Sequence, residues 1–357
     1  MSDTVALKGK QAGGWLGRNW ALLFLLIETV AFIVLGSRFY SLENLQNILV
    51  ACTWVLLLGV GETFVIITGG IDLSVGFVMG FSTVICAKFI VLLRGIGLPM
   101  PVSLAAGALI CLTVGLIPGF VNGLLVARLK VPPFLATFGM YGIAYGVAEI
   151  ICRNTPIIAP KGTGYIGNEY FFYIVPGKLF SFLVRPQNLS RLELRSMITL
   201  VPIITVVAFL IVGIFGFVLQ RTRFGRHTYA VGGSVDAASR AGINVPRHLT
   251  FVYMISSFFA SLAGVLFVLR YVTGTADAGS SLMLDAVVSV VIGGASLYGG
   301  RGTVKGTILG ALIIAVLETG MVNLSIPTFN RYIAIGGILI LAVLIDQFFP
   351  ELMTRGQ

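Results

Sequence analysis

Long apolar stretches recur along the whole chain and constrain its fold more than any other feature. Of the 357 residues, 57% are hydrophobic and only 11% are charged, whereas soluble domains carry about 25% charged residues. A helix of roughly 20 apolar residues crosses the hydrocarbon core of a bilayer. Stretches near this length occupy residues 21–37, 46–68, 73–93, 102–127, 133–152, 197–219, 249–271, 284–299, 304–323 and 332–349. The sequence therefore predicts an all-α, polytopic bundle of about ten transmembrane helices that forms one domain over residues 1–357.

The formal net charge of +10 indicates orientation in a membrane rather than nucleic-acid binding. The basic residues lie mostly in short loops between apolar stretches, and they are not interleaved with aromatic residues as in nucleic-acid-binding proteins. Outside the loop 153–196, most Lys and Arg fall in segments that are cytoplasmic if both termini are inside, as the positive-inside rule favours. The basic N-terminus lacks a small-residue cleavage site, so it is not expected to be a cleaved signal peptide.

Two long loops interrupt the apolar pattern. The first, 153–196, contains the aromatic run Tyr170–Val175, which is too short to span a bilayer and is predicted to be a short interfacial or re-entrant segment on the outer face. The second, 220–248, is predicted to be cytoplasmic. The stretch 284–299 is short and rich in glycine, so a broken or re-entrant helix is expected there.

A short capped helix is predicted inside the cytoplasmic loop, over residues 234–242. Ser234 can cap its start, Asp236 suits the positive end of the helix dipole, and Gly242 can end it in a left-handed conformation. Two helical turns are not stable alone in water. The small residues Ala237, Ala238 and Ala241 favour docking into a groove of a partner, although packing on the chain's own membrane domain remains the alternative.

Glycines at four-residue spacing indicate close helix packing. Gly115, Gly119 and Gly123 form one such row, and Gly302, Gly306 and Gly310 form a second. This spacing places each row on one helix face, where another backbone can approach. The partner helix can belong to the same chain or to another. The segments 68–76 and 292–300 also resemble each other, which fits an internal repeat or a shared glycine-rich composition.

Polar residues inside apolar stretches are candidates for a solute path, because charges at membrane depth tend to be paired or to line water. Acidic residues stand at Glu28, Glu62, Asp72, Glu149, Asp285 and Glu318. The candidates for the path are Glu62, Thr63, Asp72, Asn122, Thr137, Tyr141 and Asp285. For each of them a helix–helix hydrogen bond is the competing interpretation.

Recognisable catalytic motifs are lacking in the sequence. It has no GxxxxGK[ST] nucleotide loop, no HExxH and no GxSxG. The two histidines, His227 and His248, lack metal-ligand spacing, and no metal site is expected. The four cysteines have no CxxC spacing and fit small buried hydrophobes. The chain is therefore not expected to hydrolyse ATP or to act as an enzyme.

Three segments, in order, resemble the ribose/galactose-type ABC sugar permeases. Residues 61–76, GETFVIITGGIDLSVG, are similar to the family signature VGMTFVILTGGIDLSVG. Residues 222–245 resemble the cytoplasmic segment TRFGRYIYAIGGN…AGINV, and residues 284–300 resemble LDAIAAVVIGGTSLxGG. The resemblance covers roughly residues 40–350. Two features depart from it: Glu62 stands where Met is more usual, and the loop 153–196 is longer than in ribose permeases.

The resemblance implies a permease subunit of an ATP-driven importer in the bacterial inner membrane, moving a monosaccharide or similar small polar solute. It implies three protein partners: an ABC ATPase that holds ATP and Mg²⁺, a periplasmic or lipid-anchored solute-binding protein, and a second permease copy or close paralogue. It also assigns ATPase coupling to the helix at 234–242 and its surroundings, with the residues Gly225, Arg226, Ala230, Gly232, Ala238, Gly242 and Ile243. The solute stays open among pentose, hexose, inositol, quorum signal and nucleoside.

Two other classes of protein compete with this interpretation. An ion-coupled secondary transporter would carry its coupling ion on Glu62, Asp72 and Glu318. An intramembrane enzyme, such as a lipid-modifying transferase, would need a His, Cys or Ser constellation that the sequence lacks.

Overall fold

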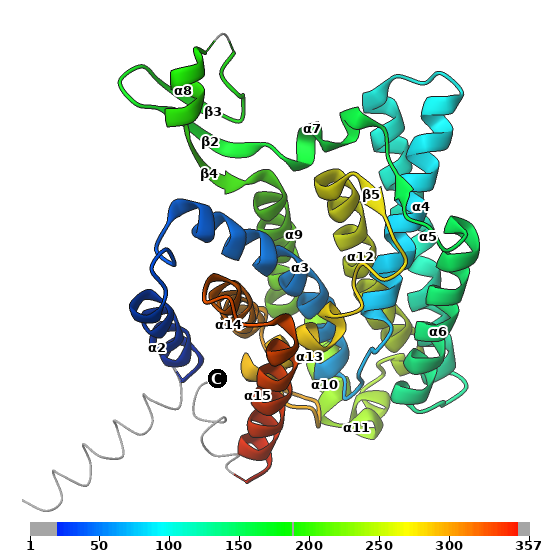
Figure 1. Cartoon of the computed structure of the whole chain (residues 1–357). Helices are drawn as coiled ribbons and strands as arrows, with labels where there is room; N and C mark the ends of the chain where they lie inside the picture. Colours follow the sequence, from blue (N-terminus) through cyan, green and yellow to red (C-terminus); the bar gives the residue numbers. More distant parts are fainter. Residues whose placement is uncertain (1–19, 188, 349–357) are drawn as a thin grey trace, which may run out of the picture.

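The computed structural model describes residues 20–187 and 189–348, which are mainly helical (Figure 1). The longer helices are α2 (Trp20–Leu35), α3 (Leu42–Ile67), α4 (Val75–Gly95), α5 (Met100–Ala127), α6 (Pro133–Cys152), α9 (Ile203–Arg221), α12 (Val245–Tyr271), α14 (Val304–Asn323) and α15 (Thr328–Phe348). The shorter ones are η1 (Lys161–Thr163), α7 (Gly164–Gly167), α8 (Arg191–Ser196), α10 (Arg223–Gly233), α11 (Val235–Arg240) and α13 (Leu282–Ile292).

Seven helices of the described chain are long and apolar enough to cross a membrane, namely α3, α4, α5, α6, α9, α12 and α14. The helices α2 and α13 and residues 329–341 of α15 are apolar but shorter. At 1.5 Å per residue, the 16 residues of α2 extend over about 24 Å, less than the roughly 30 Å of a hydrocarbon core. The helical membrane bundle is confirmed, whereas the count of about ten spans is not.

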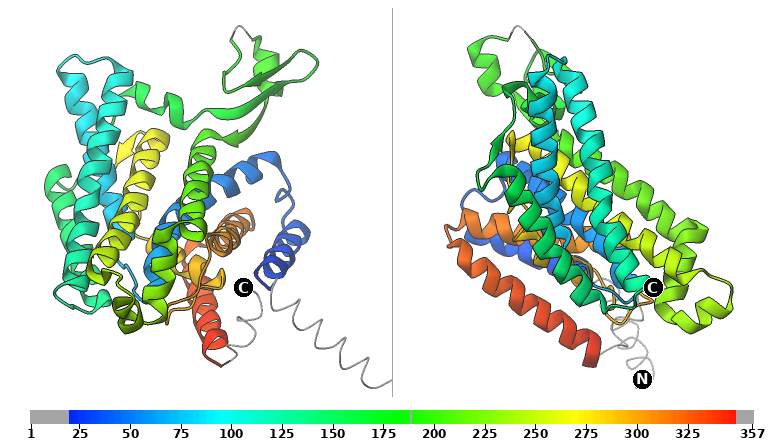
Figure 2. Two further views of the ribbon diagram at one scale, coloured as in Figure 1. Left: turned by 180° about the vertical axis from the view of Figure 1, so that it is seen from behind. Right: turned by 90° about the vertical axis from the view of Figure 1, so that its right-hand side faces the viewer.

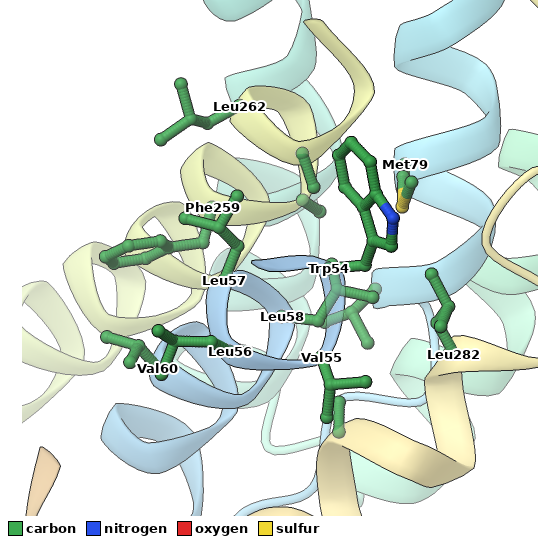
Figure 3. Close-up of a cluster of buried hydrophobic side chains, with 14 of the residues drawn as sticks. Trp54, Val55, Leu56, Leu57, Leu58, Val60, Met79, Phe259, Leu262 and Leu282 are labelled. Atoms are coloured by element: carbon green, nitrogen blue, oxygen red, sulfur yellow. The ribbon is translucent and has the colours of Figure 1, made fainter. Parts of the chain in front are cut away.

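Helix α3 forms the centre of the bundle. Of its most apolar stretch, 94% is buried, against 28% for α6 and α9. Figure 3 shows the consecutive α3 side chains from Trp54 to Leu58 packed beside Met79 of α4, Phe259 of α12 and Leu282 of α13. Because α3 is enclosed on all sides, the remaining apolar surface lies on the peripheral helices, where a bilayer can cover it.

The glycines of α5 pack against α12 of the same chain. A side chain on Gly119 would overlap the Tyr253 carbonyl oxygen, and one on Gly123 would lie 2.5 Å from Thr250 Cα. A side chain on Gly115 would overlap the Ser261 hydroxyl. These contacts confirm the predicted close packing and assign it to an intrachain partner.

The second glycine row was only partly predicted correctly. Gly306 and Gly310 lie on α14 and approach the backbones of Gly293 and Ser289. Gly302 has φ +150° and precedes α14, which Thr303 caps through its hydroxyl. The predicted three-glycine helix face is therefore wrong at Gly302, because a threonine N-cap starts the helix after it.

Replacing Gly119 with alanine is expected to destabilise the bundle by about 1–3 kcal/mol, because the new methyl group overlaps backbone rather than a movable side chain. Thermal unfolding of the detergent-solubilised protein measures the change. Gly142→Ala on α6 is the matched control, because nothing lies within 4 Å of its added Cβ. Equal unfolding temperatures for the two variants would contradict the packing described.

Five short strands make the all-α prediction wrong in the outer segment. β1 (Ile157–Ile158) pairs antiparallel with β5 (Thr273–Gly274). β2 (Tyr170–Val175), β3 (Leu179–Phe182) and β4 (Ile198–Pro202) form an antiparallel sheet in the order β3-β2-β4. The run Tyr170–Val175 is thus a central strand and not a re-entrant segment, because its backbone pairs with two neighbouring strands. β4 also takes the first residues of the predicted span 197–219.

Polar contacts hold this outer sheet and its helix together. Ser190 and Glu193 form a reciprocal capping box at the start of α8. Lys178, in the β2–β3 turn, pairs with Glu193, and its hydrogen bond lowers the pKa of Glu193 to about 2. The sheet lies at one end of the bundle and α10 and α11 lie at the opposite end, as Figure 1 and both views of Figure 2 show.

The predicted break in the stretch 284–299 is present. Helix α13 ends at Ile292, and the chain then continues through Gly293 and Gly294, with φ +91° at Gly294. Eleven helical residues extend over only about 16 Å. The non-helical backbone at Gly293 packs against Gly306 of α14, and such backbone is tolerated in a membrane protein where protein covers it.

Candidate functional site

Two short helices, α10 and α11, form a knob at the end of the bundle opposite the sheet (Figure 1). The Thr222 hydroxyl accepts a hydrogen bond from the Gly225 N–H at the start of α10. The Ser234 hydroxyl accepts one from the Ala237 N–H at the start of α11, as predicted. Gly242 has φ +84° and ends the turn after α11, which confirms the predicted left-handed stop.

The outward face of α11 is small and polar. Val235, Asp236, Ala237, Ser239 and Arg240 are exposed there. Ala238 was expected on this face, but it is buried and packs with Val231 and Val245 in a satellite core. The α-helical period turns Ala238 away from its neighbours, so the expected exposure of Ala238 is wrong.

The remaining residues assigned to coupling divide into an exposed and an enclosed group. Arg226, Ala230 and Gly242 are exposed, so a partner can reach them. Gly225 is buried, and a side chain on it would overlap the Leu219 carbonyl oxygen at the α9–α10 corner. Ile243 packs on the satellite core. The enclosed group therefore shapes the knob, and its part in coupling stays a prediction.

Gly232, near the end of α10, joins the knob to both glycine-rich segments of the bundle. A side chain on it would overlap the Ile67 carbonyl oxygen and lie 2.6 Å from the Gly300 N–H nitrogen. Gly300 donates a hydrogen bond of 2.8 Å to that same Ile67 oxygen. Tyr229, also on α10, donates through its hydroxyl to the Gly302 carbonyl at 2.6 Å. We call this contact of residues 67, 229, 232, 300 and 302 the glycine junction.

Asp72 lies in the loop that follows α3. Hydrogen bonds centred on it connect this loop with α3, α5 and α12. Its carboxylate accepts hydrogen bonds from the Ser74 N–H and hydroxyl and from the Ser256 hydroxyl of α12 at 2.8 Å. Its own N–H donates to the Glu62 carboxylate of α3 at 3.0 Å. Asn122 of α5 donates to the Ser74 hydroxyl at 3.0 Å. All of these side chains are buried, so Asp72 is the centre of an interhelical polar network.

The other predicted path residues also make helix contacts. Thr137 of α6 accepts from the Leu73 N–H at 3.1 Å. Thr63 of α3 bonds Thr307 of α14 at 2.6 Å. Tyr141 packs edge-on against Phe77, with ring centroids 4.1 Å apart. The structure thus brings Glu62, Asp72, Asn122 and Thr137 together, and their contact with solute stays a prediction.

Arg331 on α15 is an important residue that the sequence did not single out. It donates to Asp285 of α13 and to Glu318 of α14, each at 2.5 Å, and it is only 7% exposed. The predicted last span began after Arg331 and left it in a loop, whereas α15 begins at Thr328. Asp285 is therefore part of an ion triad in which Asp285 and Arg331 are buried and Glu318 is partly exposed.

A cavity of about 380 Å³ opens between the start of α3 and the end of α14, on the side of the triad that Glu318 faces. Its lining is mostly polar and comprises Arg38, Ser41, Glu43, Asn44, Asn47, Ala51, Glu318, Thr319, Val322 and Asn323. In the part of the chain that the structure describes, no three His, Cys, Asp or Glu side chains gather as a metal site.

A bundle with a broken helix, a polar centre and a capped knob at one end is the kind of architecture that a membrane transport protein can use. The family described as "Branched-chain amino acid transport system / permease component" matches residues 44–344. The chain belongs to this family. It is the permease subunit of an ABC importer, is not an enzyme, and resides as a multi-pass protein in the inner membrane.

Curated relatives cover nearly the whole chain. The fructose import permease protein of Rhizobium meliloti is 35% identical over 343 residues, covering 92% of this chain and 85% of the relative. The ribose import permease protein of Escherichia coli K12 is 32% identical, covering 97% and 98%. The galactose/methyl galactoside import permease protein of Haemophilus influenzae is 33% identical, covering 96% and 97%. No solved structure matches the chain. Family membership implies an ATPase and a solute-binding protein as partners.

Proposed function

We propose that this permease carries a monosaccharide or a similarly small polar solute, delivered by the binding protein at the end where the sheet lies. The relatives named for fructose, ribose and galactose support this solute class. The polar cavity of about 380 Å³ also supports it, because ligand pockets typically enclose about 300–1,000 Å³ and its amide and carboxylate groups can bond hydroxyls.

The working unit is proposed to contain two permease copies, identical or closely paralogous. The helices α5, α6 and α9 leave much of their apolar surface open for lipid or for a second copy.

The knob and both chain termini face the cytoplasm. The basic residues around α10, which include Arg221, Arg223 and Arg226, suit that side under the positive-inside rule. ATP and Mg²⁺ are bound by the ATPase subunit.

Coupling is proposed to run from the ATPase through α11 and α10 into the glycine junction. The observation that carries this proposal is the contact of Gly232 with Ile67 and Gly300, which belong to the two glycine-rich segments flanking α3 and α13. At the glycine junction, the backbone of Gly232 contacts the backbones of Ile67 and Gly300. A change of side-chain rotamer therefore cannot accommodate a shift of α10. The loop from Ile67 leads within five residues to Asp72 and thus to α5 and α12.

Ala237→Arg on the exposed face of α11 tests this proposal. The long cationic side chain is expected to weaken ATPase docking by about tenfold or more, measured by co-purification with the cognate ATPase and by solute uptake in proteoliposomes. Ala237 is exposed, so the fold should persist. Ser196→Arg, on an exposed residue at the opposite end, is the matched control for co-purification with the ATPase. Undiminished co-purification and uptake in Ala237→Arg would contradict docking through this face.

A further inference from the structure

Two carboxyl groups lie in the centre of the bundle without a basic partner. Glu62 and Asp72 are both 0% exposed. The ion pairs among the described residues involve Lys178 and Arg331 as cations, and neither reaches Glu62 or Asp72. Burying unpaired charge is strongly unfavourable. A counter-charge from outside the polypeptide is therefore required if both carboxyls ionise.

Four buried oxygen atoms around this pair have no hydrogen-bond partner. They are Glu62 Oε2, Asn122 Oδ1, the Tyr253 hydroxyl and the Ser257 hydroxyl. Each of these residues is at most 1% exposed. Two of the oxygens are acceptors only and two are hydroxyls. Buried polar atoms normally have hydrogen-bond partners, so four unpartnered oxygens in one region indicate a bound species.

The hydrogen bonds around Asp72 place these residues next to one another. The other oxygen of Glu62 accepts from the Asp72 N–H, and the Asn122 amide is linked to Asp72 through Ser74. Ser256 of α12 donates to Asp72. The Ser257 hydroxyl faces α5, where it lies 2.7 Å from a Cβ built on Gly119, one turn before Asn122. The Tyr253 hydroxyl lies 2.6 Å from a Cβ built on Gly70, in the same loop as Asp72. Helices α3, α5 and α12 thus each supply at least one unpartnered oxygen around the loop that holds Asp72.

The chemistry of this oxygen set favours a monovalent cation. Carboxylate, amide and hydroxyl oxygens are hard ligands of the kind that alkali and alkaline-earth cations prefer. Ca²⁺ takes six to eight oxygens and draws on several carboxylates, and no third acidic side chain of residues 20–187 and 189–348 joins Glu62 and Asp72. The Asp72 carboxylate already accepts three hydrogen bonds, so the charge that needs a cation is that of Glu62, and a water molecule would leave it uncompensated. A proton on Glu62 would neutralise one carboxyl without reaching Asn122, Tyr253 and Ser257.

We propose that Glu62, Asn122, Tyr253 and Ser257 bind one monovalent cation of the size of Na⁺ beside Asp72. The cation joins α3, α5 and α12 at the point where the Asp72 network holds them together. The site is additional to solute transport and to the ATPase contact.

The test is thermal unfolding of the full chain in detergent, with NaCl replaced stepwise by choline chloride at constant ionic strength and pH. Na⁺ is expected to raise the unfolding temperature and to saturate. In Glu62→Gln the half-saturating Na⁺ concentration should rise by about tenfold or more, because the charged ligand is lost. Tyr253→Phe, which removes only the hydroxyl, should also raise it. Glu28→Gln, a buried and unpartnered carboxyl on α2, is the matched control and should leave it unchanged.

Two results would overturn the proposal. Equal unfolding temperatures in Na⁺ and choline would show that the centre holds no cation. A Na⁺ response that persists unchanged in both Glu62→Gln and Tyr253→Phe would place the bound cation elsewhere. If Glu62→Gln does not fold, the titration of Tyr253→Phe alone decides between these outcomes.

Discussion

Arg331→Leu is expected to destabilise the permease by about 3–5 kcal/mol, the range for breaking a buried ion pair. The guanidinium bonds Asp285 and Glu318, and Asp285 is 1% exposed. Leucine preserves much of the volume but leaves Asp285 without its cation. The penalty therefore comes from an uncompensated charge, and not from a cavity. Because α13, α14 and α15 each supply one member, the three helices should loosen together.

Thermal unfolding in detergent measures this effect, with two variants to assign its cause. Adding Asp285→Asn and Glu318→Gln to Arg331→Leu should recover most of the lost stability, since neutral amides need no counter-charge. Lys178→Ala, which removes the exposed pair with Glu193, should change little because surface pairs contribute little. An unchanged unfolding temperature in Arg331→Leu would show that the triad is not a charged network.

The membrane-spanning helices could be predicted because hydropathy is a local property of the chain. The stretch 304–323 coincides with α14, and 133–152 coincides with α6. The α11 caps at Ser234 and Gly242 were also predicted, because a cap depends on residues within one turn. The stretch 21–37 likewise overlaps α2, which the structure describes from Trp20 to Leu35.

The ion triad could not be predicted because its members are far apart in the sequence. Arg331 is 46 positions from Asp285 and 13 from Glu318. Hydropathy places a charged residue at the end of an apolar stretch in a loop, and only the packing of α15 against α13 brings it into the interior. The outer strands were missed for a related reason, since Tyr170–Val175 becomes a strand only by pairing with β3 and β4.

Part of the polar centre was visible in the sequence and part was not. Glu62, Asp72, Asn122 and Thr137 were selected as polar residues in apolar stretches, and the structure joins them through Ser74 and Leu73. Tyr253 was not selected, although its hydroxyl is buried without a partner beside Asp72. A tyrosine in an apolar helix fits membrane packing as well as it fits a polar site, so its type alone gave no signal.

Gly232→Val is expected to reduce solute uptake by about 10- to 100-fold while the ATPase still co-purifies, in line with typical coupling free energies of 1–3 kcal/mol. A side chain at this position overlaps the Ile67 carbonyl oxygen and crowds Gly300, so α10 must move away from the glycine junction. The exposed face of α11 lies beyond Gly232 and remains available to the ATPase. ATP hydrolysis should therefore continue with little transport.

Gly233→Val separates this effect from a general loss of helix propensity in α10. Gly233 is the next residue, ends the same helix and has nothing within 4 Å of an added Cβ. Valine carries the same propensity at both positions, so the difference between the two variants reports the contact of position 232 with Ile67 and Gly300. Loss of uptake in both variants would assign the defect to α10 itself. Full uptake in Gly232→Val would mean that ATPase movement reaches the spanning helices by a route other than the glycine junction.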